Sequence, residues 1–136
     1  MSETRIDLHT LSDDECWALL RSHRPRLGRL AFVDHGRPLV LPVNFALRGD
    51  VVYFRTAHGS KLAAAARGDW AAFEVDDVNE VWEDGWSVLA HGRLHLVSDA
   101  DELTVIERLP LRSWAGGDKP HHLRLDIEAL SGRRIS

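Results

Sequence analysis

The chain lacks the residues that mark several large classes of protein. A single cysteine, Cys16, among 136 residues excludes an intramolecular disulfide and any metal cluster built from several cysteines. No apolar run is long enough to span a bilayer, and the first residues carry neither an apolar signal core nor a lipidation pattern. These absences predict a soluble cytoplasmic protein that does not act at a membrane.

Positive charge is also scarce. Lysine and arginine number 17 against 21 aspartates and glutamates, which gives a net charge of −4. That balance argues against a general nucleic-acid binder. Lys61 and Lys119 are the only lysines, so a site that needs a flexible ammonium group has few candidates.

The composition is otherwise that of a globular domain. Hydrophobic residues make up 44% of the chain and charged residues 28%, which excludes wholesale disorder. A chain of this length holds one hydrophobic core, so we expect a single domain over residues 1–136.

The hydrophobic periodicity begins as helical and then becomes extended. Ser12 and Glu15 have the spacing of a capping box, which predicts a helix over 12–23. Strands are predicted over 29–33, 39–47, 51–56, 70–75, 86–97 and 122–127, with helices over 61–67 and 98–109. We expect Ser98 to cap the last helix, the first three strands to form a meander, and the acidic stretch 76–85 to be a loop. Many short strands without βαβ alternation favour a small antiparallel barrel.

The segment 53–62 has the clearest arrangement for binding chemistry. A strand ends at Thr56, a glycine loop follows, and Ser60 and Lys61 open a helix. A helix start offers backbone N–H groups and the positive end of the dipole, which together favour an anion such as phosphate. The alternative is that Ser60 only caps the helix and that Lys61 is an exposed residue of its first turn.

Several short motifs recur in one family in this order. They are Pro42-Val43-Asn44-Phe45, Val52-Tyr53-Phe54-Arg55-Thr56, Gly59-Ser60-Lys61-Leu62, Phe73-Glu74-Val75-Asp76, Gly85-Trp86-Ser87-Val88, Gly92-Arg93 and Ser131-Gly132-Arg133-Arg134-Ile135. In these motifs the chain resembles the pyridoxamine 5′-phosphate oxidase-like flavoproteins, in the branch that includes nitroimidazole-resistance-type proteins. The resemblance runs from about residue 11 to residue 135.

The resemblance implies a split β-barrel of about six or seven antiparallel strands with peripheral helices. It also implies a homodimer with FMN at the subunit interface. Val43, Asn44 and Phe45 would then run along the isoalloxazine ring. The ribityl phosphate would be held by Thr56, Ser60 and Lys61, and Trp86 and Ser87 would approach the flavin from the partner subunit.

The resemblance further implies an FMN-dependent oxidoreductase that acts on a small molecule, with no side-chain acid or base identified. The true oxidases carry a second basic residue after the serine, whereas here Leu62 follows Ser60 and Lys61. Their C-terminal Trp-x-Arg signature is also missing, which argues against pyridoxamine phosphate as the substrate. The alternatives are a non-catalytic flavin- or haem-binding module, with His58 as an available haem ligand, and a deazaflavin-dependent reductase.

Other polar residues give weaker signals. The eight histidines do not predict a metal site, because His91 and His95 lie four residues apart on a strand, too far to chelate one ion. Cys16 falls on the apolar face of its helix, which is typical of a buried structural thiol. Glu74 interrupts an apolar strand and needs a partner if it is buried. Trp114, beside a glycine pair, could stack on a planar ligand.

Overall fold

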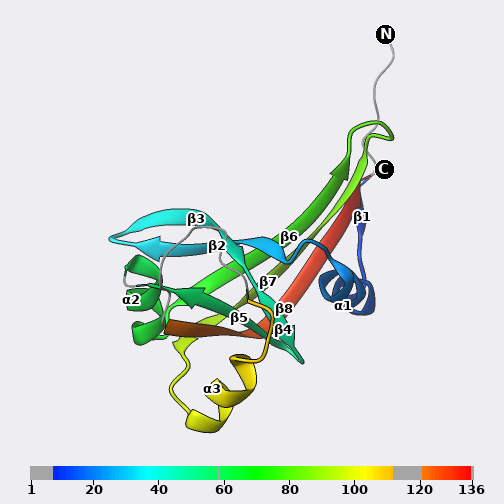
Figure 1. Ribbon diagram of the computed structural model, residues 1–136. Helices are drawn as coiled ribbons and strands as arrows, with labels where there is room; N and C mark the ends of the chain where they lie inside the picture. The colour runs from blue at the N-terminus through cyan, green and yellow to red at the C-terminus, as the bar shows by residue number, and fades with distance from the viewer. Residues whose placement is uncertain (1–7, 58, 112–120, 136) are drawn as a thin grey trace.

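The computed structural model describes residues 8–57, 59–111 and 121–135 and is built around one antiparallel sheet (Figure 1). In chain order its elements are β1 (Leu8–Thr10), α1 (Asp13–Ser22), β2 (Leu27–Asp34), β3 (Arg37–Asn44), β4 (Ala46–Arg48), β5 (Val51–Thr56), α2 (Ser60–Arg67), β6 (Trp70–Asn79), β7 (Asp84–Leu96), α3 (Ala100–Ile106) and β8 (His121–Ile135). Strands neighbour one another in the order β3-β2-β6-β7-β8-β5-β4, and β1 pairs with β8. The sheet curls into a half-barrel with the three helices around it, which confirms the predicted split barrel.

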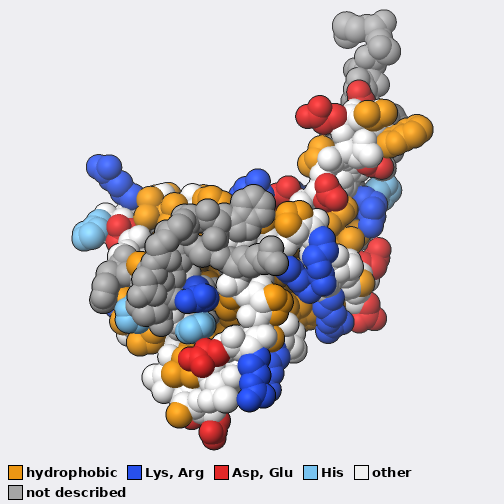
Figure 2. Space-filling view, viewed as in Figure 1, with side chains coloured by type: hydrophobic (Ala, Val, Ile, Leu, Met, Phe, Trp, Pro, Cys, Tyr) orange, Lys and Arg blue, Asp and Glu red, His pale blue; other side chains and the backbone are white. Residues whose placement is uncertain are grey.

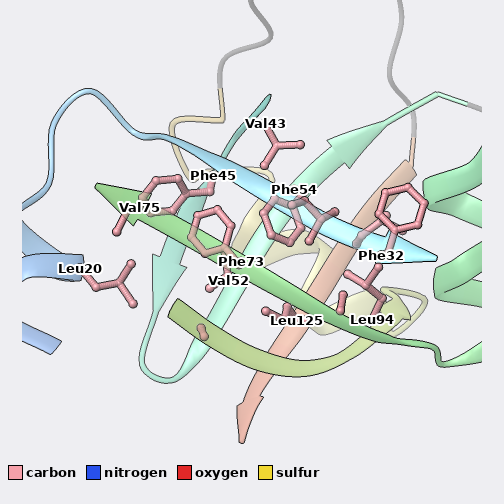
Figure 3. Close-up of a cluster of buried hydrophobic side chains, with 14 of the residues drawn as sticks. Leu20, Phe32, Val43, Phe45, Val52, Phe54, Phe73, Val75, Leu94 and Leu125 are labelled. Atoms are coloured by element: carbon pink, nitrogen blue, oxygen red, sulfur yellow. The ribbon is translucent and has the colours of Figure 1, made fainter. Parts of the chain in front are cut away.

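The main hydrophobic core lies inside the curl. Phe73 on β6 packs edge to face against Phe45 at 4.9 Å and against Phe54 of β5 at 5.5 Å between ring centroids (Figure 3). Strands β5 and β6 are not neighbours in the sheet, so these rings meet across the inside of the curl. Aromatic packing of this kind holds the two sides of the half-barrel together.

Strand β5 is buried on both faces, which explains its uninterrupted apolar sequence. Val52 and Phe54 point into the main core, whereas Val51 and Tyr53 belong to a second cluster with Ile106 of α3. The Tyr53 hydroxyl also donates a hydrogen bond of 2.8 Å to Glu102 Oε2, and Arg124 forms an ion pair with the same carboxylate. These contacts attach α3 to the outside of the sheet.

Helices α1 and α2 begin and end within one residue of the prediction, whereas α3 is shorter than the predicted helix over 98–109 and has a different cap. Ser12 and Glu15 form the expected capping box, in which Glu15 N–H donates to Ser12 Oγ at 3.2 Å and Ser12 N–H to Glu15 Oε1 at 3.1 Å. Helix α3 is capped by Asp99 and not by Ser98, because the Asp99 carboxylate accepts the Glu102 N–H at 2.9 Å. The prediction of Ser98 as the cap was therefore one residue early.

The predicted meander is wrong. The segment 39–47 is not one strand but two, β3 and β4, divided at the fully buried Phe45. Strand β3 pairs with β2, whereas β4 pairs with β5, and the two hairpins lie at opposite ends of the sheet order. Strand β5 finds its second neighbour in β8, about seventy residues later in the sequence.

The acidic stretch 76–85 is a strand hairpin and not the expected loop. Strand β6 continues to Asn79 and β7 starts at Asp84, because β7 pairs along its length with a β8 that runs to Ile135. Asn79 Oδ1 accepts hydrogen bonds from the N–H groups of Val81 and Trp82 and so forms the turn. We call this projecting hairpin, residues 76–87, the arm; hydrophobic and acidic side chains gather at its tip (Figure 2).

Candidate functional site

The start of α2 has the features of an anion site. Gly59 is the N-cap residue, with a φ of +144° that favours glycine, and its carbonyl accepts the first helical hydrogen bond from Ala63 N–H at 3.1 Å. Ser60 and Lys61 are therefore the first two helical residues, so the side chain of Ser60 is not the cap. The N–H groups of a first turn have no partner within the helix, and this turn contains no acidic side chain. Thr56 lies buried at the end of the preceding strand.

The second predicted group, Val43, Asn44 and Phe45, lies where β3 ends. Val43 and Phe45 are buried in the main core, and the Arg26 guanidinium lies 5.3 Å from the centre of the Phe45 ring. Asn44 is half-buried between them. Because the side chains on either side of Asn44 are used for packing, this segment can offer a ligand its backbone and the Asn44 amide, but not the Phe45 ring.

The third predicted pair, Trp86 and Ser87, lies on β7 and points in two directions. Trp86 shares the face of the core residue Val88 and packs edge to face against His23 at 5.4 Å. Ser87 alternates to the outer face of the sheet. Ser87 lines a pocket on that face.

The residues predicted to bind phosphate lie far from Ser87 within one chain. Thr56 pairs with His121 at the start of β8, whereas Ser87 pairs with Arg133 near its end. Twelve residues of extended strand correspond to roughly 40 Å of chain length. The structure therefore does not bring the eight predicted residues together within a single chain.

The outer face of the sheet carries a pocket of about 560 Å³ beside Ser87. Its lining is mostly polar and comes from β1, β6, β7 and β8: His9, Thr10, Glu74, Ser87, Leu89, Ser131, Gly132 and Arg133. The volume falls within the range of small-molecule sites. Of these residues, sequence reasoning had proposed Ser87 for binding and had marked Glu74 only as needing a partner.

Glu74 is the most perturbed carboxylate of this pocket. Arg29 Nη1 lies 3.6 Å from Glu74 Oε1 and 3.0 Å from Asp76 Oδ2, so one guanidinium serves two carboxylates. Glu74 Oε1 is buried and accepts no hydrogen bond from any residue that the structure describes. Burial, and then the interaction with the Asp76 carboxyl, raise the pKa of Glu74 to about 7, although Arg29 acts in the opposite direction.

A smaller pocket of about 350 Å³ lies beside α3 and includes Arg55 and His122. Burial, followed by the nearby Arg55 charge, lowers the pKa of the His122 imidazole. Cys16 is fully buried, and burial raises the pKa of its thiol, which agrees with the expected structural role. His58, named as an available haem ligand, and Trp114, named as a residue that could stack on a planar ligand, lie outside the described residues.

The described residues contain no group of three or more His, Cys, Asp or Glu side chains placed to hold a metal ion. None of the helices within these ranges is long and apolar enough to cross a membrane.

The fold and the site define a split-barrel protein with a positively polarised helix start and a polar pocket on its outer face. The chain belongs to the pyridoxamine 5′-phosphate oxidase family, whose model matches residues 12–134. This membership confirms the family resemblance drawn from the motifs.

The chain is similar to several actinobacterial and proteobacterial proteins. The uncharacterized protein Rv0080 of Mycobacterium tuberculosis is 32% identical over 119 residues, 78% of each chain. The FAD binding protein from Mycobacterium smegmatis is 35% identical, with a TM-score of 0.76 over 93% of this chain and 97% of that one. A FAD-binding protein from Mesorhizobium loti is 26% identical, with a TM-score of 0.79 over 95% of this chain and 99% of that one.

Proposed function

We propose that the protein binds a flavin nucleotide and acts as a flavin-dependent oxidoreductase on a small molecule. The start of α2 carries this proposal, because its helical N–H groups, Ser60 and Lys61 form a local site for a phosphate group in a chain whose net charge is negative. Two similar structures are named as FAD-binding proteins. FMN is our first choice of ligand, and FAD shares its ring and ribityl phosphate.

The residues near α2 suit distinct parts of such a ligand. Ser60 and Lys61 would hold the phosphate together with Thr56. The backbone of Val43, Asn44 and Phe45, with the Asn44 amide, would lie along the ring system, because the Val43 and Phe45 side chains are buried in the core. When bound, the flavin supplies hydride transfer, while the protein supplies position and electrostatics.

The distance between the two halves of the site supports a homodimer. Thr56 and Ser87 pair with residues at opposite ends of β8, so the two side chains of one chain cannot both contact the same flavin. A second copy that brings Ser87 to the flavin of the first would complete the site, whereas Trp86 packs against His23 of its own chain. We therefore propose that flavin lies at an interface between two copies of the chain.

Lys61 provides the test of the phosphate site. We expect Lys61→Ala to weaken FMN binding about tenfold or more, because a charge-assisted contact to phosphate is lost. The measurement is an FMN titration followed by the quenching of flavin fluorescence. Arg67→Ala is the matched control, since Arg67 lies at the other end of the same helix in an ion pair with Asp69.

Arg67→Ala should retain the FMN affinity of the unchanged protein. Full affinity in Lys61→Ala would remove the phosphate assignment. FAD, a reduced deazaflavin and haem are titrated in parallel, and preference for a deazaflavin or haem would favour one of the alternative functions.

Turnover separates the enzyme from a flavin carrier. We expect the flavin spectrum of the loaded protein to bleach with a nicotinamide donor and to recover when an electron acceptor is added. A bound flavin that does not exchange electrons with any donor under these conditions would favour a non-catalytic binding module.

A further inference from the structure

Two adjacent cross-strand rows contain the residues on the floor of the outer pocket, and both rows extend beyond it to Arg29 and Asp76. In the first row Arg29 on β2, Glu74 on β6, Leu89 on β7 and Ser131 on β8 are direct partners. In the second row the partners are Asp76, Ser87, Arg133 and Thr10. Residues two apart on a strand share a face, so the two rows lie side by side.

This outer face is chemically unlike the inner one. The alternate residues of the same strands, Phe73, Val75, Val88 and Ala90, are almost fully buried in the main core. The packing of the barrel therefore does not need the polar groups of the outer rows. Among the polar side chains of these rows, Glu74, Asp76 and Ser87 are half-buried and the others are exposed. Half-buried polar groups are costly unless they find partners, so the presence of Glu74 and Ser87 in the lining of a cavity indicates a ligand.

The charges of the pocket are separated across its width. On the β6 side Glu74 and Asp76 share the single guanidinium of Arg29. When both carboxyl groups are ionised, which with a Glu74 pKa of about 7 occurs above neutral pH, the two negative charges share one cation. Arg133 lies on β8, two strand spacings away, or about 10 Å. The floor between them carries Leu89 and the Ser87 hydroxyl.

Glu74 is the group that most needs a partner. Its Oε1 is buried without a hydrogen-bond donor among the described residues, and its nearest cation, at 3.6 Å, lies closer to Asp76. A carboxyl group in this position gains most from a ligand that brings both a donor and a positive charge. Because the carboxyl lines the cavity, such a ligand can reach it from the pocket side.

We propose that this pocket binds a small molecule through a cationic nitrogen, such as an amine or an amidinium, which pairs with Glu74. Leu89 forms an apolar contact for the body of the ligand, and Ser87 and Ser131 offer hydroxyl groups on either side. Binding here does not require flavin. Its assignment as the substrate pocket does rest on the proposed function, because Ser87 is the residue that would lie beside the flavin of a second copy.

The binding test uses benzamidinium and its uncharged analogue benzamide as probes, measured by calorimetry on the full chain without flavin. We expect benzamidinium to bind about tenfold or more tightly than benzamide, and Glu74→Gln to remove that preference. Asp77→Asn is the matched control, because Asp77 is an exposed acidic residue on the same strand that does not line the pocket. It should bind both probes as the unchanged protein does.

A pH series on the unchanged protein gives a second readout that does not depend on the folding of any variant. With a Glu74 pKa of about 7, its ionised fraction rises about tenfold between about pH 6 and about pH 8. Benzamidinium affinity should rise by about the same factor, whereas benzamide affinity should not. The other charged groups that face Glu74 or line its pocket are Arg29, Asp76, Arg133 and His9, and His9→Gln should leave the rise in place.

The outcomes separate this inference from the proposed function. Equal binding of the two probes, no binding at millimolar concentration, or unchanged benzamidinium affinity in Glu74→Gln overturns the cation pocket, whatever the flavin titration shows. Glu74-dependent binding in a chain that takes up no flavin supports the pocket and overturns the flavin proposal.

Discussion

At the scale of one residue, Glu74 shows how the place of a side chain in a sheet changes its pKa. Its neighbours in the sequence, Phe73 and Val75, are core residues, and alternation places Glu74 on the opposite face of β6. Asp76, two residues further along β6, lies on the same face, and cross-strand pairing sets Arg29 beside Glu74. The sequence could mark Glu74 as a polar interruption, but only the folded structure shows the burial that, with Asp76, raises its pKa against the effect of Arg29.

The raised pKa makes stability depend on pH in a defined direction. Folded Glu74 has a pKa of about 7 against an ordinary value of 4.5, so the folded state binds its proton more tightly. This contribution to stability is complete below about pH 4.5 and is lost as the pH rises through about 7. We expect Glu74→Gln to gain stability relative to the unchanged protein as the pH rises, by roughly 2 kcal/mol after allowance for solvent screening.

The measurement is the difference between the two urea unfolding free energies at about pH 5 and about pH 8. Taking the difference removes groups that titrate in both proteins, including His122, whose pKa is shifted downward. A constant difference across this range would contradict the assigned perturbation of Glu74.

At the scale of elements, the pairing of β7 with β8 depends on close backbone contact at one glycine. The register shifts between His91 and Gly92, and a Cβ at Gly92 would lie 1.9 Å from the Asp126 carbonyl oxygen. Real Cβ atoms do not approach backbone so closely, so a larger residue must displace one strand. The Gly92-Arg93 motif noted in the sequence therefore has a packing role in this bulge.

We expect Gly92→Ala to lower the free energy of unfolding by about 2 kcal/mol or more, because the clash is with backbone and cannot be relieved by a rotamer change. Thermal and urea unfolding measure the loss. Gly36→Ala is the matched control: its φ of +76° costs about 1 kcal/mol, but its surroundings are open. If the two variants lost the same free energy of unfolding, the backbones of β7 and β8 would not be in close contact at Gly92.

At the scale of the whole molecule, the chain has features of a protein that works as a pair. The predicted flavin contacts lie at two ends of one strand, and the arm holds Val81 and Trp82 in solvent at 84% and 76% exposure. Exposed apolar groups at a projecting tip suit contact with another surface. The proposed dimer would use Thr56 and Lys61 of one copy with Ser87 of the other.

Subunit mixing tests this arrangement. Lys61→Ala damages one half of the proposed site and Ser87→Trp the other, so each variant alone should bind FMN poorly. After the two are unfolded, mixed in equal amounts and refolded, random pairing leaves about one quarter of the sites with both halves intact. We expect FMN titration of the mixture to show that fraction at normal affinity.

Two results would contradict the shared site. If the mixture binds no better than the separate variants, Lys61 and Ser87 do not meet in one site. If sedimentation shows only single chains at micromolar concentration, an interface-bound flavin is excluded.

The sequence by itself determined much of the local structure of this protein. Three features follow from residues close by in the chain: the capping box of Ser12 and Glu15, the helix over 60–67 with Gly68 as its C-cap, and the strand 51–56. The family motifs, read together, also indicated the split barrel. Such features are local in origin, because capping groups, turn glycines and hydrophobic period act over a few neighbouring residues.

Only the tertiary structure decided which strands pair and whether each face of a strand packs in the core or lines the outer pocket. It divided 39–47 into two strands, covered both sides of β5, and turned Trp86 inward while Ser87 faced the outer pocket. The physical reason is that the period of two along a strand determines which side chains share a face, but it does not determine which other strand pairs with it. Partners such as β5 and β8 are chosen by long-range burial across the curl of the sheet.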